Sequence, residues 1–240
     1  MLSPVERALS YPYDAPHGSY LLANGRAEAY CPPSALPERR VPVIAYGSNR
    51  APIQLARKYP DASHRIPVEA AWLEGFDAVY AARLSGYGAV PATLAPCPGC
   101  RLPVKITWLN QAQLPAMHRS EGVGVAYDFG ILEVPILAEH SGLLPRALVY
   151  VAQAGAYAPD GEPLGLAEIA SEQRRWQALA QRALQQMLAD RYSPGIAAEA
   201  FAETTIATLS EKAARAQLMA QSALPWQEKR FRPLAPEGPL

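Results

Sequence analysis

The sequence has few of the features that mark several common classes of protein. It has only three cysteines in 240 residues, an odd number that argues against a disulfide framework and fits a reducing compartment. Basic and acidic residues number 22 each, so there is no net charge, and no basic stripe suggests nucleic-acid binding. No run of about 18 apolar residues occurs, and no secretory signal is recognisable. We therefore expect a soluble, cytoplasmic protein with no nucleic-acid or membrane partner.

Motifs for metal, serine-nucleophile and nucleotide chemistry are also missing. The four histidines show no helical pair around a glutamate, and neither a Gly-x-Ser-x-Gly elbow nor a P-loop occurs. Cys97-Pro98-Gly99-Cys100 offers only two metal ligands, and Cys31 has no partner motif. Because Pro-Gly favours a type II turn, we predict a hairpin tip there, while a reversible disulfide stays open. We expect neither a metal nor an organic cofactor.

The chain divides into three parts by composition. Half of the residues are hydrophobic, which is enough for a substantial core. Residues 1–40 contain many turn formers and predict an irregular N-terminal leader packed on the main domain, with room for a short helix at its start. Residues 41–165 form the predicted main domain, and residues 166–240 a predicted helical C-terminal extension.

The main domain begins with a predicted strand, tight turn and helix. Residues 41–45 form a short apolar run that ends at Gly47, as a buried strand does. Pro52 suits the first turn of a helix that Pro60 stops. The rest of the domain shows short apolar runs broken by Gly and Pro, which favour a compact, mostly antiparallel sheet or small barrel. The candidate strands are residues 66–73, 77–84, 92–95, 101–109, 125–136 and 145–152, with a short helix over 111–120.

The extension shows helical spacing. Its apolar residues recur on one face of a predicted helix that begins near Leu166 and is broken at Ser193-Pro194-Gly195. A second helical stretch covers roughly residues 197–223. The fold class predicted from these patterns is α+β with a helical appendage.

The turn after the first predicted strand, Tyr46-Gly47-Ser48-Asn49, is a candidate binding loop. Gly47 has no Cβ, so the backbone can turn sharply and approach a ligand closely. The following residues open a helix, whose first amides lack partners and favour an anionic group. Gly, Ser and Asn are also common turn and cap residues. The residues alone therefore leave both an anion-binding loop and a plain turn open.

Further motifs follow this turn in order along the chain. Residues 88–94 place a glycine before an alanine-threonine strand, and Glu121-Gly122-Val123 precedes a strand that opens with Ala126-Tyr127. Tyr150 lies in the apolar strand of residues 147–151. Together with Tyr46-Gly47-Ser48-Asn49, these motifs resemble the γ-glutamylcyclotransferase-like family.

The resemblance covers roughly residues 41–160 and includes two departures from the family pattern. Met117-His118 stands where the family has Leu-Asp, and Arg50 stands where members often have an apolar residue. A surface position is the simpler interpretation of His118. At Arg50 we expect the substrate contacts to differ from those of the family.

The resemblance implies a fold and a reaction. The implied fold is a small mixed or antiparallel β-barrel with flanking helices, to which the C-terminal helices are appended. In the implied reaction, the α-amine of a γ-glutamyl group attacks its own γ-carbonyl and releases 5-oxoproline and a free amine, without metal or cofactor. Glu121 is the implied general acid and base. The implied substrate-binding residues are Tyr46, Gly47, Ser48, Asn49, Arg50 and Tyr150.

Two other functions remain open at this stage. The same fold can serve as a non-catalytic binding or interaction module for small molecules, because fold does not fix function. A related acyl transfer that removes a γ-glutamyl group from a different amine is a third candidate. The sequence identifies neither the amine part of a γ-glutamyl substrate nor the oligomeric state.

Overall fold

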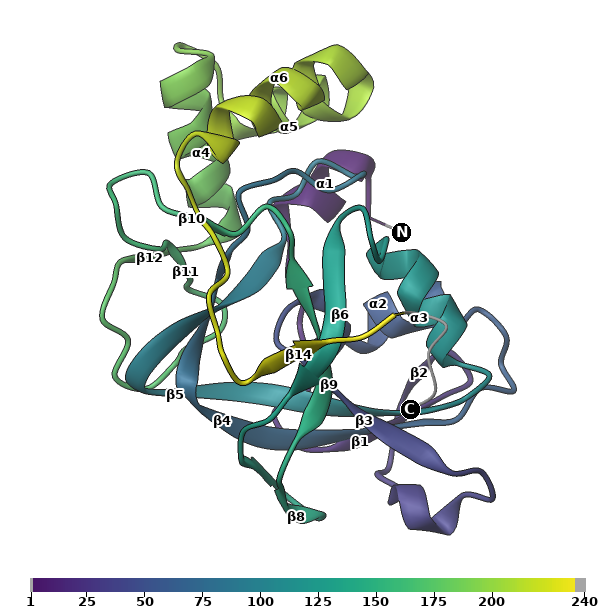
Figure 1. The fold of residues 1–240 in the computed structure, drawn as a ribbon. Helices are drawn as coiled ribbons and strands as arrows, with labels where there is room; N and C mark the ends of the chain where they lie inside the picture. Colours follow the sequence, from purple (N-terminus) through teal and green to yellow (C-terminus); the bar gives the residue numbers. More distant parts are fainter. Residues whose placement is uncertain (1, 236–240) are drawn as a thin grey trace.

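Two long antiparallel strands form the centre of the protein (Figure 1). The structure, a computed structural model, describes residues 2–235. β4 (Ile66–Tyr80) pairs with β5 (Ala92–Asn110) along nearly all of its length, with one irregularity between Glu74 and Phe76. The glycines and prolines that predict strand ends in this region therefore lie within continuous strands.

One sheet takes up most of the remaining strands. Its order is β12-β11-β4-β5-β3-β9-β6-β14, and the pairs β1–β2 and β7–β8 attach beside β4. All pairs are antiparallel except β3–β9 and β11–β12. The bounds are β1 Tyr20–Ala23, β2 Arg26–Glu28, β3 Arg40–Ala45, β6 Tyr127–Leu132, β7 Ile136–Ala138, β8 Gly142–Leu144, β9 Ala147–Ala152, β11 Gly165–Leu166, β12 Ala178–Leu179 and β14 Phe231–Pro233. A separate pair joins β10 (Ala156–Tyr157) to β13 (Ala223–Leu224). The α+β class is confirmed, while closure of the sheet into a barrel stays a prediction.

The first forty residues are more regular than the sequence predicts. They contain α1 (Pro4–Leu9), whose N-terminus Ser3 and Glu6 cap reciprocally, and the 3₁₀ turn η1 (Pro33–Ala35). β1 and β2 form a hairpin that joins the sheet through β4, and all four residues of β1 are buried. The short helix expected at the start is present as α1, whereas the prediction of an irregular leader is wrong for β1 and β2, because pairing with a long strand stabilises a run too short to be recognised alone.

The strand, turn and helix around the candidate loop form as predicted. β3 leads into the 3₁₀ turn η2 (Ser48–Arg50), and α2 (Pro52–Lys58) follows with proline in its first turn. The predicted short helix before Glu121 is α3 (Leu114–Glu121), which ends at Gly122 in the left-handed conformation. α2 and α3 lie next to each other at one side of the sheet (Figure 1).

The predicted helix from Leu166 is wrong in its first half. Residues 165–180 form two short strands and turns, and the first C-terminal helix, α4 (Gln181–Tyr192), begins only after them. α5 (Ala198–Ala207) and α6 (Leu209–Ala220) replace the predicted second helix. Tertiary contacts override the helical spacing, because Ser171, Arg174 and Trp176 all donate hydrogen bonds to the buried Asp77 of β4.

The CxxC segment also differs from the prediction. Cys97 and Cys100 lie inside β5, opposite the irregularity of β4 at Gly75, so the predicted hairpin tip is wrong. Both cysteines are buried, and a disulfide joins them. A bulge between two long strands has the same Pro-Gly signal as a hairpin turn, since both require a glycine with positive φ, as at Gly99.

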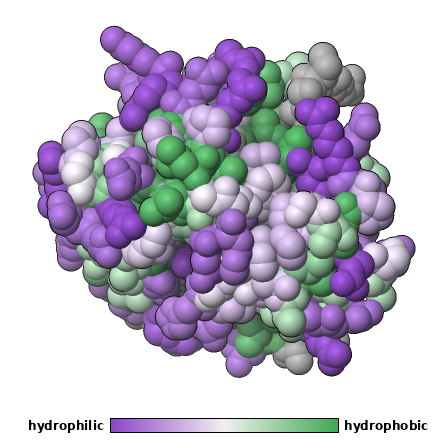
Figure 2. All heavy atoms as spheres, turned by 90° about the horizontal axis from the view of Figure 1, so that it is seen from below, coloured by the Kyte–Doolittle hydropathy of each residue, from purple (hydrophilic) through white to green (hydrophobic). Residues whose placement is uncertain are grey.

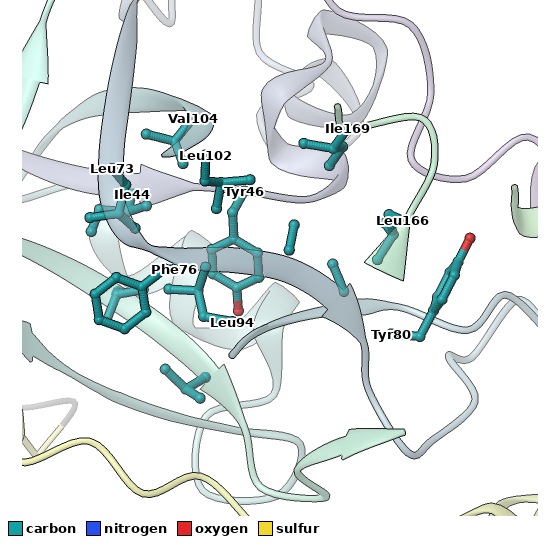
Figure 3. Close-up of a cluster of buried hydrophobic side chains, with 14 of the residues drawn as sticks. Ile44, Tyr46, Leu73, Phe76, Tyr80, Leu94, Leu102, Val104, Leu166 and Ile169 are labelled. Atoms are coloured by element: carbon teal, nitrogen blue, oxygen red, sulfur yellow. The ribbon is translucent and has the colours of Figure 1, made fainter. Parts of the chain in front are cut away.

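The main core lies between the sheet and the segments that cover it. Figure 3 shows the ring of Tyr46 among aliphatic side chains that include Ile44, Leu94 and Leu102. Because Tyr46 is the first residue of the candidate loop, this packing fixes the start of the loop to the core.

No helix among residues 2–235 is both long enough and apolar enough to cross a membrane. Figure 2 shows the face that lies at the bottom of Figure 1, where hydrophobic residues gather in small groups among hydrophilic ones. The β7–β8 hairpin lies at this end and exposes Leu137 and Leu143.

A buried carboxylate gives the fold a predictable dependence on pH. Glu69 of β4 accepts hydrogen bonds from the backbone amides of His140 and Ser141, the Ser141 hydroxyl and the Trp108 indole. Burial acts to raise the pKa of Glu69, but these hydrogen bonds outweigh it, so the pKa lies below its usual value. As the pH falls, Glu69 is therefore protonated at a higher pH in the unfolded chain than in the folded protein.

We expect the stability contributed by Glu69 to be present above about pH 4.5 and to be lost as the pH falls through its folded pKa. Glu69→Gln should lower the free energy of unfolding by about 2 kcal/mol at pH 7. In this variant the free energy of unfolding should also fall less steeply as the pH is lowered. Urea denaturation at about pH 7, 5 and 3.5 measures both effects, with Glu133→Gln, at a half-exposed carboxylate, as the control. An acid-side slope that stays unchanged in Glu69→Gln would contradict the assignment.

Candidate functional site

Glu121 meets the candidate loop although the two are far apart in the sequence. The Asn49 side-chain amide donates to Glu121 Oε1 over 2.8 Å, across 72 residues. This contact arises because η2 follows the end of β3 and contacts α2, while α3, which ends at Glu121, also packs against α2. Asn49 Oδ1 is buried and has no hydrogen-bond partner among residues 2–235. An acceptor without a donor therefore stands next to the carboxylate.

The carboxylate of Glu121 forms an ion pair with a lysine. Lys58, the last residue of α2, donates to Glu121 Oε1, and its ammonium also lies 3.5 Å from Met117 Sδ. Only 7% of the Lys58 side chain and 13% of the Glu121 side chain are exposed. The position next to Glu121 and Asn49 thus accommodates an ammonium group.

A tyrosine from the leader places its hydroxyl beside the loop, where a backbone amide donates a hydrogen bond to it. The Tyr11 hydroxyl accepts a hydrogen bond of 2.7 Å from the Ala92 amide. Burial raises the pKa of this phenol well above its usual value, although the backbone amides of Ala92 and Ser48 act to lower it. A Cβ on Gly47 would lie 2.5 Å from the Tyr11 oxygen, so only glycine allows this approach. The Tyr11 oxygen therefore lies against Gly47 of the loop and is held by the backbone amide of Ala92.

Further tyrosines surround Glu121. Tyr46 donates its hydroxyl to the carbonyl of Tyr150, and the Tyr150 hydroxyl lies 2.9 Å from His118 Nδ1. Burial raises the pKa values of Tyr46, Tyr127 and Tyr150, and the charge of Glu121 adds to this rise. All three phenols are therefore neutral at physiological pH, and the hydroxyls of Tyr46 and Tyr127 already donate to the carbonyls of Tyr150 and Ala92.

The histidine before Glu121 is part of this cluster rather than a plain surface residue. The ring of His118 packs edge-on against Phe129 and Tyr150, with centroids 4.5 and 5.8 Å apart. Burial lowers its pKa below the usual value, so the ring is neutral at pH 7.

These groups enclose a small cavity. The cavity has a volume of about 40 Å³, room for about one water molecule and far below the several hundred Å³ of ordinary ligand pockets. Of the residues predicted to form the site, it is lined by Tyr46, Gly47, Ser48, Asn49, Glu121 and Tyr150. Tyr11 and Lys58 fill the space around it, so a larger molecule enters only when one of these side chains withdraws.

Arg50 does not face this cavity. Its side chain lies on the other side of the loop, where it lines two clefts that contain neither Glu121 nor Tyr150. The 3₁₀ turn explains the separation, because Arg50 ends η2 and points away from the residues that begin it.

A groove with several cations adjoins the cavity. Its volume is about 680 Å³, and Tyr11, Ser48, Glu121 and Tyr127 line both spaces. Glu121 is its one carboxylate, and it is paired with Lys58. The other basic residues of this cationic groove are Arg7, Arg57, Arg83 and Arg119. None of these four has an ion-pair partner among residues 2–235, so the groove favours an anionic ligand.

Sequence reasoning missed Tyr11 and Lys58, and it did not assign Tyr127 to the site. Tyr11 lies in a turn-rich leader, and no local pattern separates Lys58 from other basic residues of a short helix. Tyr127 could have been assigned to the site from the sequence, because it opens the strand that follows Glu121. For metals, residues 2–235 contain no group of three or more His, Cys, Asp and Glu side chains placed to hold an ion.

No protein-family model matches the chain, and no curated protein matches it. Solved structures similar to part of it include an Arabidopsis thaliana protein, 19% identical, over 50% of this chain and 72% of that chain, with a TM-score of 0.38. An uncharacterized Homo sapiens protein is 20% identical over 48% and 68% of the two chains, with a TM-score of 0.36. A γ-glutamyl cyclotransferase is 18% identical over 48% and 67%, with a TM-score of 0.37. Likenesses of this strength carry no conclusion about function.

Proposed function

We propose that the protein cyclises a γ-glutamyl amine or peptide to 5-oxoproline and releases the amine, with Glu121 as general acid and base. One observation carries the proposal: Glu121, Asn49 and the amides of the loop meet at a single cavity. The carboxylate there holds an ammonium, from Lys58, and the Ala92 amide beside the loop holds an oxygen, from Tyr11. A γ-glutamyl group offers the same two kinds of atom, an α-ammonium and carboxylate or carbonyl oxygens.

In this proposal the substrate replaces both internal groups. The α-ammonium takes the place of the Lys58 ammonium at Glu121, and Asn49 Oδ1 gains the donor that it lacks. Glu121 removes a proton from the ammonium, because only the neutral amine can attack. The amine then attacks the γ-carbonyl carbon within the same molecule, so correct folding of the substrate replaces an encounter in solution.

The second half of the reaction needs an acid. Attack forms a C–N bond of the five-membered lactam and places negative charge on the former carbonyl oxygen, which the amides of Ser48 and Ala92 stabilise once Tyr11 has withdrawn. When the original amide C–N bond breaks, the proton held by Glu121 passes to the leaving nitrogen. Ring closure leaves a second extra proton on the lactam nitrogen, and Glu121 takes this proton and passes it to the released amine. The products are 5-oxoproline and the amine as its ammonium ion, and Glu121 returns to its carboxylate form.

The small cavity favours a second candidate, a non-catalytic binding module. Its volume of about 40 Å³ and the Lys58–Glu121 ion pair describe a site that is closed in the absence of a ligand. A module of this kind binds γ-glutamyl compounds or other small anions without turning them over.

A substrate panel separates the two candidates. The purified protein is incubated with γ-glutamyl dipeptides, γ-glutamylamines and glutathione, and 5-oxoproline release is followed by chromatography. The enzyme gives 5-oxoproline from at least one member of the panel. Saturable binding by calorimetry without any release would support the module instead.

The cationic groove predicts which substrates are preferred. Because the groove adjoins the cavity, we expect it to contact the leaving amine, and its unpaired arginines favour an amine that carries a carboxylate. Arg83→Gln and Arg119→Gln should each raise KM about fivefold for a γ-glutamyl dipeptide, the equivalent of about 1 kcal/mol. For the matching C-terminal amide, KM should change little.

Arg26→Gln is the matched control, since Arg26 is exposed and lies outside the groove. An equal rise in KM for the dipeptide and its amide would show that the arginines do not recognise the carboxylate. That result would not contradict the cyclisation itself.

A further inference from the structure

A second cluster of positive charge lies behind the candidate loop. Arg50 at the end of η2 and Lys105 of β5 line one cleft of about 510 Å³, a volume in the range of small-molecule sites. Trp72 and Leu137 provide apolar walls. The other ionisable residues that line the cleft are Arg101, Glu139 and His17. We call this space the Arg50–Lys105 cleft. It shares no lining residue with the cavity at Glu121.

The guanidinium of Arg50 is partly buried without a counter-charge. It forms no ion pair and no side-chain hydrogen bond among residues 2–235, and its Nε is buried without a partner. Burial lowers the pKa of Arg50, which expresses the cost of desolvating this cation. A partly buried, unpaired cation is unfavourable, and an anion beside it would remove that cost.

Lys105 adds a second cation to the same cleft. Only 2% of the residue is exposed, and its ammonium donates to the carbonyls of His17 and Gly18 over 2.7 and 2.8 Å. An ammonium has three donors, so one N–H remains. Burial lowers the pKa of Lys105 to about 8, and repulsion by Arg50 lowers it more than the attraction of Glu139 raises it.

The other charged side chains of the cleft are already engaged. The Glu139 carboxylate accepts hydrogen bonds from the amide and hydroxyl of Ser19, at 3.1 and 2.5 Å. Arg101 stacks on Trp72, 4.3 Å from the ring centroid, and its guanidinium lies 3.5 Å from Glu172. Arg50 and Lys105 are thus two neighbouring cations of the cleft that form no ion pair among residues 2–235, and Glu139 is the one carboxylate among the lining residues.

We propose that the Arg50–Lys105 cleft is a second binding site, for a small organic anion that carries a phosphate or two or more carboxylates. The guanidinium of Arg50 and the free N–H of Lys105 bind the anionic group, and the apolar part of the ligand packs on Trp72 and Leu137. The site is independent of cyclotransferase activity, because neither Glu121 nor the cavity beside it contributes to it.

Calorimetric titration with inorganic phosphate and with citrate tests the site, each against sodium chloride of equal ionic strength. We expect saturable binding of at least one probe, weakened about tenfold or more in Arg50→Gln. Arg119→Gln is the matched control, since it removes the same charge from the cationic groove on the other side of the loop. Absence of saturable binding, or an equal weakening in Arg119→Gln, would overturn the proposal.

Thermal unfolding gives a second, independent measurement. In anion-free buffer Arg50→Met should keep or raise Tm, because it removes an unpaired, partly buried charge but keeps much of the apolar stem. The rise in Tm that phosphate or citrate gives the wild-type protein should be lost in this variant. A guanidinium with a purely structural role gives the opposite pattern: a lower Tm without anions and an undiminished rise with them.

Discussion

Glu121→Gln is expected to reduce the release of 5-oxoproline by about 10²- to 10⁴-fold, the usual contribution of a positioned acid and base. The amide keeps the shape of the side chain and can still accept the hydrogen bond from Asn49. It cannot take the proton of the substrate ammonium or return one to the leaving amine. The loss should therefore appear in kcat, measured under saturating substrate.

The ion pair with Lys58 complicates this variant and requires its own control. Removing one partner of a largely buried pair leaves the other charge without compensation, so Glu121→Gln is expected to lose stability as well. Glu121→Gln/Lys58→Met removes both charges and should recover stability while staying inactive. If activity returned in the double variant, Glu121 would be a structural partner of Lys58 and the proposed mechanism would be wrong.

Glu133→Gln serves as the matched exchange at an exposed carboxylate, and its activity should equal that of the wild-type protein. Circular dichroism of every variant shows whether the fold persists. These comparisons separate a lost proton transfer from a lost fold.

The sequence was most informative where local chemistry decides the structure. Gly47, Pro52 and Pro60 predicted the turn and the limits of the helix after β3, and the structure contains both. The resemblance to the γ-glutamylcyclotransferase-like family also implied that Glu121 belongs with Tyr46-Gly47-Ser48-Asn49, and the structure brings these residues to one cavity. Their role in catalysis stays a proposal.

Contacts between distant segments could not be predicted in the same way. Tyr11 reaches the loop from a leader whose sequence is rich in turn formers, and its partner amide comes from Ala92, 81 residues further along the chain. The direction of Arg50 depends on the 3₁₀ geometry of η2, which no residue type reveals. Helical spacing failed after Leu166, because the energy of a buried polar network exceeds the weak preference of a few residues for a helix.

That network is centred on Asp77, and its loss has the largest expected effect on stability. Asp77 is fully buried and accepts hydrogen bonds from Arg174 Nε at 2.6 Å, Arg174 Nη2 at 2.9 Å and Trp176 Nε1 at 2.7 Å. The Ser171 hydroxyl and the Ala78 amide also donate to it. One carboxylate of β4 thus holds much of the segment of residues 165–180 in an extended path.

Asp77→Asn should destabilise the protein by about 3–5 kcal/mol, because Arg174 is left largely buried without its counter-charge. For a chain of this size that corresponds to a fall in Tm of roughly 10 °C. Urea denaturation measures the free energy, and hydrogen exchange over residues 165–180 shows whether this segment opens first. Arg182→Gln, which removes a cation from an exposed pair with Glu199, should cost less than about 1 kcal/mol.

The double variant Asp77→Leu/Arg174→Met tests whether the unpaired charge of Arg174 causes the loss of stability. Replacing both members of a buried pair by apolar residues of similar size costs less than removing one of them, so the double variant should be more stable than Asp77→Leu alone. The remaining loss then reflects the Ser171 and Trp176 donors, which keep no acceptor in either variant. A double variant that is no more stable than Asp77→Leu would mean that these donors, rather than the ion pair, hold the segment against β4.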